Sequence, residues 1–304
     1  MLDFDEIAKI CGINGEFDNF ASKISELDNK YEKDDLILIY NYILTNSKHP
    51  AILTEVIKLA DRFRDETTLD FLVKILSDGD KTEEFVSVRS LCAKAISNYK
   101  NTNVVTSLLN CLNNKNEHYR VRLACADALG KIGDKYAVAP LIDVANDENE
   151  KSVYLRESAV SALGLIGDMR AIDPLVSILE TKQGILNKFT FLKERALEAL
   201  AKLKLDDNER AFKALKSTLI DDSPQIRINA IEALMESNNP KAAEAIKTCL
   251  KDENEEVQKN ALIALYNLIG RDILDEVISL PIYSNFLKNE AQMIIKEYEE
   301  NNDE

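Results

Sequence analysis

A nine-residue pattern recurs along the chain at a nearly constant interval, and this repetition constrains the fold more than any other feature. The six copies are VRSLCAKAI (88–96), VRLACADAL (121–129), LRESAVSAL (155–163), LKERALEAL (192–200), IRINAIEAL (226–234) and VQKNALIAL (257–265). The second residues of successive copies lie 33, 34, 37, 34 and 31 positions apart. A period of about 34 residues is typical of a solenoid of stacked helix pairs.

Each copy is preceded by another apolar segment, so each unit reads as helix A, a short loop and helix B. Apolar residues recur at three- and four-residue spacing in both segments, as in Leu141, Val144 and Ala145. Neither helix can bury its apolar stripe alone, so the units must stack. The chain has only nine glycines and six prolines in 304 residues. Since sandwiches, barrels and doubly wound sheets need many tight turns, the sequence predicts an all-α protein.

The run VRLACADALGKIGDKYAVAPLIDVANDEN, followed by LRESAVSALGLIGDMRAIDPLVSILE, resembles HEAT repeats of the short type named for the phycobilisome lyase (PBS lyase HEAT-like). The resemblance covers roughly residues 66–295. It implies a right-handed α-α superhelix with A helices outside and B helices inside. It carries over no catalytic residue, because the repeat is an architectural motif. Four glycines of this motif are expected to let the chain leave helix B: Gly130, Gly133, Gly164 and Gly167.

The repeat boundaries divide the chain into three segments. Residues 1–33 do not fit the repeat and are expected to form two helices that cap the first repeat. Residues 34–297 are expected to form the HEAT-repeat solenoid of about seven helix pairs. Residues 298–304 are expected to be an acidic C-terminal tail.

The second residue of the nine-residue copy, at the start of helix B, is basic in five of the six copies, and we call this position the basic column. Its members are Arg89, Arg122, Arg156, Lys193 and Arg227. One interpretation is a row of cations that binds an anion. The other, which the resemblance implies, is structural: each cation bonds an acidic group in the preceding A–B loop and joins neighbouring repeats. Asp221 lies six residues before Arg227, as the structural role requires. We favour the structural interpretation.

Cysteine and histidine give no sign of a metal, redox or catalytic site. The cysteines are scattered without a CxxC pair, which indicates a reducing compartment. Cys92 and Cys125 occupy a position that holds Ala in the other copies, and Cys111 and Cys249 share an apolar position of helix A, so we expect small buried side chains. His118 lies alone in a loop and is expected to be solvated. We predict no metal, no cofactor and no enzymatic activity.

The formal charge is −15, from 38 basic and 53 acidic side chains, and the chain has no Trp. This composition opposes a nucleic-acid enzyme, which needs a basic surface and aromatic contacts to bases. The N-terminus is acidic where a signal peptide would be basic, and no segment is apolar enough to span a bilayer. We therefore expect a cytoplasmic protein that binds neither nucleic acid nor a membrane.

The exposed face of the B helices is the first candidate binding surface. Positions five and nine residues after the basic column share one helical face and avoid the buried Ala and Leu positions. In the first half of the chain this face is mixed, and in the second it becomes acidic and apolar. The candidate residues there are Leu165, Glu198, Glu232, Glu236, Ile263, Met293 and Glu297. Apolar groups within a polar rim are typical of a protein-binding surface, and a merely solvated face is the alternative.

The second candidate is the loop TKQGILNKFTF (181–191), which lengthens one repeat and is unusually apolar. Its candidate binding residues are Ile185, Leu186, Phe189 and Phe191. Insertions in solenoids collect on one edge and often bind partners. The alternative is that this loop folds back onto the seam between its two helices.

Charge indicates what kind of partner to expect. Residues 249–304 hold 13 acidic and 5 basic side chains, a net charge of −8. Acidic fields attract basic surfaces and accelerate their encounter. We therefore predict a non-enzymatic scaffold or adaptor that binds a protein with a basic patch, through the concave groove or the 181–191 loop. The alternative is an accessory factor that assembles, activates or loads a cofactor onto a multisubunit enzyme complex.

Overall fold

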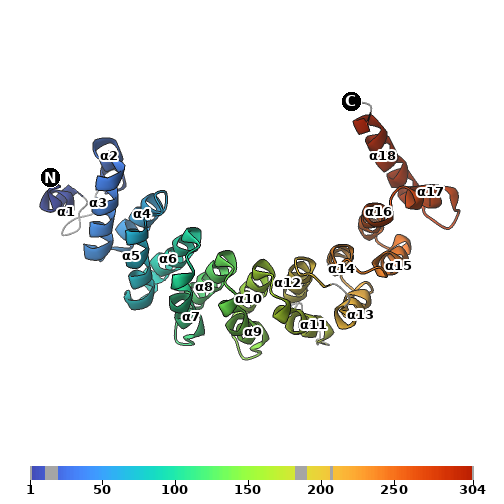
Figure 1. Cartoon of the computed structure of the whole chain (residues 1–304), viewed down its shortest axis with the longest axis horizontal. Coiled ribbons are helices and arrows are strands. Elements are labelled where there is room, and N and C mark those ends of the chain that lie inside the picture. Colours follow the sequence, from blue (N-terminus) through green and yellow to red (C-terminus); the bar gives the residue numbers. More distant parts are fainter. Residues whose placement is uncertain (1, 11–19, 182–189, 206–207, 303–304) are drawn as a thin grey trace. The chain divides into compact units, whose positions relative to one another are not determined.

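The computed structural model describes residues 2–10, 20–181, 190–205 and 208–302. Over these ranges every regular element is a helix and no strand occurs (Figure 1). The prediction of an all-α solenoid of helix pairs is confirmed. Cys11, Ile185, Leu186 and Phe189 lie outside the described residues.

The chain forms two compact units, Met1–Ala162 and Leu163–Glu304, and the boundary falls inside helix α10 (Val153–Ile166). The helices of unit 1 before α10 are α1 (Phe4–Ile10), α2 (Phe20–Lys30), α3 (Lys33–Asn46), α4 (Pro50–Ala60), α5 (Glu66–Asp78), α6 (Val86–Tyr99), α7 (Val105–Asn113), α8 (Tyr119–Ile132) and α9 (Val138–Asn146). Contacts join α3 to α4, α5 to α6 and α7 to α8, which are the expected A–B pairs. The B helices α4, α6 and α8 also contact one another in succession. Helices α1 and α2 contact α3 and α4, the first pair.

Unit 2 repeats this arrangement. Its helices after α10 are α11 (Ile172–Glu180), α12 (Thr190–Ala201), α13 (Glu209–Thr218), α14 (Pro224–Glu236), α15 (Ala242–Lys247), α16 (Glu255–Ile269), α17 (Asp272–Ser279) and α18 (Asn285–Asn302). The B helices α12, α14, α16 and α18 contact one another in succession and so form one layer. The last helix continues to Asn302, into the segment expected to be a tail.

Short 3-10 turns connect some B helices to the next A helix. In two of them, Lys135–Ala137 and Met169–Ala171, an aspartate before the turn accepts a hydrogen bond from a backbone N–H two residues on. Gly133 and Gly167 precede these aspartates with φ of +79° and +71°, a left-handed conformation that L side chains adopt only at a cost. These two glycines therefore end their helices as the sequence predicted.

The expectation for the other two glycines of the motif was wrong. Gly130 and Gly164 lie inside helices α8 and α10 and do not end them. A Cβ at Gly164 would lie 2.7 Å from the Cα of Ala199 in α12, closer than real side chains approach a backbone. Gly164 thus allows α10 and α12 to pack closely, and it does not serve to end a helix.

The core follows the repeat. The apolar residue before the basic column and the Ala or Cys three residues after it are fully buried in every copy, as at Val121 and Cys125 or at Ile226 and Ala230. Among the described residues, no helix is both long and apolar enough to cross a bilayer. The repeat leaves one face of each B helix uncovered, and this face is where the candidate site lies.

Candidate functional site

The basic column forms a ladder of hydrogen bonds between consecutive A–B turns of unit 1. The guanidinium of Arg89 donates to the carbonyl of Leu76 at 3.0 and 3.2 Å and to the carboxylate of Glu117, with one bond of 2.8 Å. Arg122 donates in the same way to the Leu112 carbonyl and the Glu150 carboxylate, both at 2.7 Å. In each case the carbonyl ends the preceding A helix and the carboxylate belongs to the next repeat.

Unit 2 has the same ladder. Lys193 donates to Asp221 at 3.0 Å, and Arg227 donates to both oxygens of Asp252 at 2.7 and 2.8 Å. Arg227 also donates to the Asp221 carbonyl at 2.8 Å. Arg156, in unit 1, donates to the carbonyl of Ala145 at 2.9 Å.

The sequence placed the carboxylate partner in the preceding loop, and that expectation was wrong. The preceding turn supplies backbone carbonyls, whereas the carboxylate lies 25 or 28 residues further on, as in Arg227–Asp252 and Lys193–Asp221. Burial opposes the charge of Glu117, but the hydrogen bonds from Arg89 and from the His118 N–H outweigh it and hold the pKa of Glu117 below its usual value. Since Arg89 is buried and fully engaged, it is not presented to an external anion.

The exposed face of the B helices in unit 2 carries the residues that the sequence singled out. We call this set the unit 2 ridge: Leu165, Glu198, Glu232, Glu236, Ile263, Met293 and Glu297. Leu165 and Met293 are each 53% exposed and Ile263 is 39% exposed, so the solenoid itself does not bury them. Since α12, α14, α16 and α18 contact one another in succession, the ridge residues from Glu198 to Glu297 lie along adjacent helices. Leu165 lies on α10.

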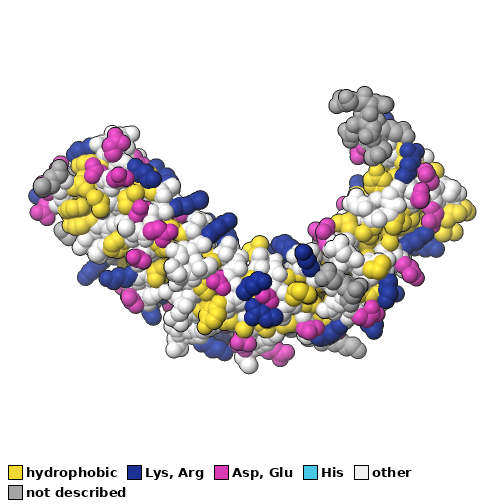
Figure 2. Space-filling view, viewed as in Figure 1, with side chains coloured by type: hydrophobic (Ala, Val, Ile, Leu, Met, Phe, Trp, Pro, Cys, Tyr) yellow, Lys and Arg dark blue, Asp and Glu magenta, His cyan; other side chains and the backbone are white. Residues whose placement is uncertain are grey.

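The carboxylates of the unit 2 ridge differ in how far they are neutralised. Glu198 forms an ion pair with Arg195 at 2.6 Å, one turn away on α12. Glu232 and Glu236 on α14 are exposed and have no ion-pair or hydrogen-bond partner among the residues that the structure describes. Acidic side chains are visible at the upper edge of α14 (Figure 2). The ridge therefore presents free negative charge beside apolar side chains.

Phe191 is the one described candidate from the 181–191 loop. It belongs to the first turn of α12, which begins at Thr190, and so it is helical where the sequence suggested a loop. Its side chain is 60% exposed and stands two residues before Lys193 of the ladder. Phe191 is thus a further exposed apolar group at the start of a B helix in unit 2.

Four of the cysteines and His118 lie in the described part of the chain, and each has a structural surrounding. Cys92, Cys111, Cys125 and Cys249 are free and buried, and burial raises the pKa of Cys92 far above its usual range. A hydrogen bond from the Cys125 thiol lowers the pKa of Cys111. The sequence did not indicate that these two thiols, on α7 and α8, lie close together. In the described ranges no group of three or more His, Cys, Asp or Glu could hold a metal ion.

His118 departs from the sequence prediction. It is partly buried and caps the N-terminus of α8, where its Nδ1 accepts a hydrogen bond from the Arg120 N–H at 3.2 Å. Its Nε2 lies 3.7 Å from the carboxylate of Glu83. The side chain is therefore an N-cap and not a solvated loop residue.

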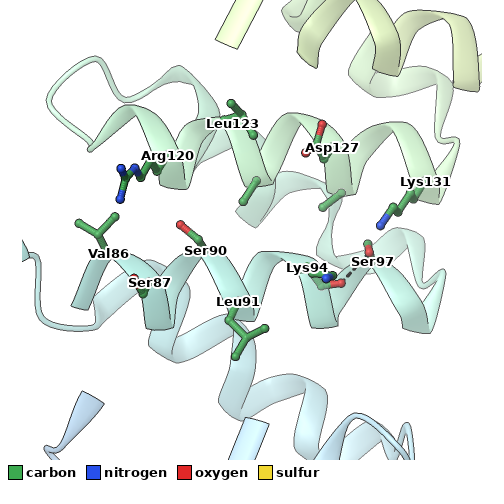
Figure 3. A pocket seen from close by; sticks show the side chains of 12 residues that line it. Val86, Ser87, Ser90, Leu91, Lys94, Ser97, Arg120, Leu123, Asp127 and Lys131 are labelled. Carbon is green, nitrogen blue, oxygen red and sulfur yellow. Dashed lines mark hydrogen bonds between the residues drawn. The ribbon is translucent and has the colours of Figure 1, made fainter. Parts of the chain in front are cut away.

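Unit 1 contains a hollow that sequence reasoning missed. It lies between the B helices α6 and α8 and has a volume of about 530 Å³ (Figure 3). Arg120 stands at one end, and Lys94 and Lys131 stand at the other. The sequence does contain these cations at defined repeat positions. Arg120 lies two residues before the basic column, Lys94 five residues after it and Lys131 nine residues after it. This pattern was read only as mixed charge.

Comparison with known proteins gives one family. The family model of HEAT repeats matches residues 79–153, 115–190 and 185–266.

The solved complex of CpcE and CpcF of phycocyanin lyase from Nostoc sp. PCC7120 is 22% identical, covers 84% of this chain and 94% of that chain, and has a TM-score of 0.47. Human deoxyhypusine hydroxylase in complex with glycerol is 16% identical, covers 87% of this chain and 95% of that chain, and has a TM-score of 0.36. A computationally designed armadillo repeat protein for modular peptide recognition is 20% identical, covers 81% of this chain and 98% of that chain, and has a TM-score of 0.38. The search of curated proteins gave no match.

Proposed function

The chain belongs to the HEAT-repeat family, and from that premise we propose that it is a non-enzymatic scaffold that binds a protein partner on the unit 2 ridge. The partner presents a basic patch with apolar side chains at its centre. The observation that carries the proposal is the combination of Glu232 and Glu236, which have no partner in the described part of the chain, with the exposed Ile263 and Met293 on the neighbouring B helices.

Charge and apolar contact have different effects in such a complex. The free carboxylates attract a basic surface from a distance, which accelerates association at low ionic strength. The apolar side chains act only on contact, when water leaves. Burying a fully exposed Leu, Ile or Met side chain contributes roughly 1.5–3 kcal/mol, and these half-exposed ones contribute less. The ridge therefore supplies both a fast encounter and a means of retention.

Cys92 is not placed to act as a nucleophile, which agrees with a scaffold role. Cys92 has a raised pKa and no access to solvent, so its thiolate is disfavoured as a nucleophile. We also propose a cytoplasmic location, which the scattered cysteines without a CxxC pair support. The mixed acidic and apolar ridge gives this surface a physical basis for binding proteins.

The proposal is tested by affinity purification of the full chain and of a Glu232→Lys/Glu236→Lys variant, with quantification of every co-purified protein. Because neither carboxylate has an intramolecular partner in the described structure, the reversal should leave the fold intact. A matched control reverses two exposed carboxylates outside the ridge, Asp222→Lys/Glu244→Lys, with the same change of net charge.

The expected result is one or more proteins that are depleted roughly tenfold with the ridge variant and retained with the control. The depleted proteins should also dissociate at high salt, since screening weakens exposed charge interactions. Equal depletion by both variants would mean that total charge, and not the ridge, governs the interaction.

A further inference from the structure

We infer that the hollow between α6 and α8 in unit 1 is a second binding site, which takes an extended acidic peptide segment of a protein partner. The inference does not depend on the unit 2 ridge, because it rests on different residues with the opposite charge. Twelve residues line the hollow, and three of them are the cationic Lys94, Arg120 and Lys131. The lining includes a single carboxylate, that of Asp127.

The cations of the hollow are available to a ligand. Lys94 and Lys131 are exposed, and their ammonium groups have no ion-pair or hydrogen-bond partner in the described ranges. The guanidinium of Arg120 lies over the ring of Tyr119, 5.9 Å from its centroid, and its Nε donates to the Tyr119 hydroxyl at 3.3 Å, while the side chain remains exposed. In the space-filling view, Lys and Arg side chains project from the edge formed by α6 and α8 (Figure 2).

Asp127 offsets only part of this charge, one carboxylate against three cations. Its carboxylate accepts a hydrogen bond from the Ser158 hydroxyl of α10 and is turned away from α6 (Figure 3). The hollow therefore keeps a local excess of positive charge on a chain whose formal charge is −15. A basic site attracts anionic ligands at short range, and the distant acidic surfaces of the same chain repel them only weakly because salt screens charges beyond about 10 Å.

The walls between the cationic ends favour a peptide. Leu91, Leu123 and Ala124 provide partly exposed apolar surface, and Ser87 provides an exposed hydroxyl group. The hydroxyl oxygen of Ser90 is buried between the helices and has no hydrogen-bond partner in the described part of the chain. No aromatic side chain lines the hollow, so the stacking that single-stranded nucleic acids use is missing from this lining.

The helix geometry sets the spacing of the acidic groups. Arg120 and Lys131 are 11 positions apart in α8, which separates their Cα atoms by about 16 Å at 1.5 Å per residue. An extended chain advances about 3.3 Å per residue, so about five residues span this distance. The ligand is therefore a peptide with carboxylates about five residues apart and short apolar side chains between them.

A peptide of this pattern tests the inference directly. The probe is fluorescein-labelled EEALALEE, and the control probe is QQALALQQ, which has the same length and no carboxylate side chains. Binding to the full chain is measured by fluorescence anisotropy at low and at physiological ionic strength. The full chain should bind the glutamate probe about tenfold more tightly than the glutamine probe at low ionic strength.

Two charge-reversal variants localise the binding. Lys94→Glu/Lys131→Glu should abolish the preference for the glutamate probe. Lys48→Glu/Lys74→Glu, which reverses two exposed lysines outside the hollow, should retain it. The helical circular dichroism and thermal unfolding of both variants should match those of the parent chain, because all four lysines lack partners in the described structure.

Three outcomes would overturn the inference. The first is equal affinity of the parent chain for the two probes at low ionic strength. The second is an equal loss of binding in both double variants, which would indicate attraction by total charge. The third is displacement of the glutamate probe by an oligothymidylate of the same charge at equal concentration, which would assign the hollow to single-stranded nucleic acid.

Discussion

The two units are built from the same repeat, yet they differ at one ladder pair and in what they expose, whereas the pairs Arg122–Glu150 and Arg227–Asp252 are buried alike. In unit 1 the ladder pair Arg89–Glu117 has side chains 2% and 4% exposed, whereas the unit 2 pair Lys193–Asp221 has side chains 23% and 21% exposed. On the exposed face, unit 1 carries the unpartnered cations Lys94 and Lys131, and unit 2 carries unpartnered carboxylates.

The positions of the repeat fall into two classes, buried ones that hold the helices together and exposed ones that do not. Buried positions hold the same type of side chain in both units, either apolar or cationic, since a change there leaves a cavity or an unpaired charge. The columns five and nine residues after the basic residue are exposed, and their charge reverses between Lys131 and Glu236. Because stacking does not constrain these columns, the two units can recognise different ligands with the same backbone.

The largest effect is expected at the buried ladder pair of unit 1. Glu117→Gln removes the charge that compensates Arg89, and breaking a buried ion pair costs about 3–5 kcal/mol of the free energy of unfolding. The matched change in unit 2, Asp221→Asn beside Lys193, should cost about 1 kcal/mol or less, because this pair is partly solvated. Urea unfolding of both variants measures the difference, and equal losses would contradict the contrast between the units.

The same pair makes the stability of unit 1 sensitive to acid. The pKa of Glu117 is lowered on folding, so its stabilising contribution is complete above the unfolded value near 4.5 and is lost as the pH falls through the lower value of the folded state. The free energy of unfolding of the parent chain should therefore drop over this range more steeply than that of Glu117→Gln. Parallel pH profiles for the two proteins would show that Glu117 is not responsible.

The next effect is expected at Gly164 in unit 2. An added Cβ would meet the Cα and Cβ of Ala199 at 2.7 and 2.9 Å, and backbone cannot move aside as a flexible side chain can. Overpacking of this kind costs about 1–3 kcal/mol, more than the gain in helix propensity of about 1 kcal/mol. Gly164→Ala should thus destabilise the chain in thermal unfolding, and a raised melting temperature would show that α10 and α12 can separate freely.

The smallest effect is expected from making unit 1 more like unit 2. Cys92 and Cys125 occupy the column that holds Ala196 and Ala230 in unit 2, and all four side chains are buried. Cys92→Ala and Cys125→Ala should each cost on the order of 1 kcal/mol or less and leave partner binding unchanged. A folded Cys125→Ala variant that no longer binds its partner would show that the contact between Cys111 and Cys125 has a functional role.

The sequence predicted the helices and the buried columns because both follow from local periodicity. It did not predict that Arg89 pairs with Glu117, since that contact depends on how one repeat stacks on the next. The packing role of Gly164 was missed for the same reason, because Ala199 lies 35 positions away. The ridge residues could be selected from their helical positions, whereas the hollow of unit 1 required the space between two helices to be seen.

The most direct test of the proposed scaffold role is site-specific photo-crosslinking on the unit 2 ridge. Benzoylphenylalanine replaces Ile263 or Met293 on the ridge, or Glu244 on an A helix as the control. The experiment uses a partner that the Glu232→Lys/Glu236→Lys variant fails to retain. The account predicts crosslinks to the partner from both ridge positions and none from position 244, with the yield falling as salt is added. A bound partner that crosslinks from position 244 and from neither ridge position would contradict it.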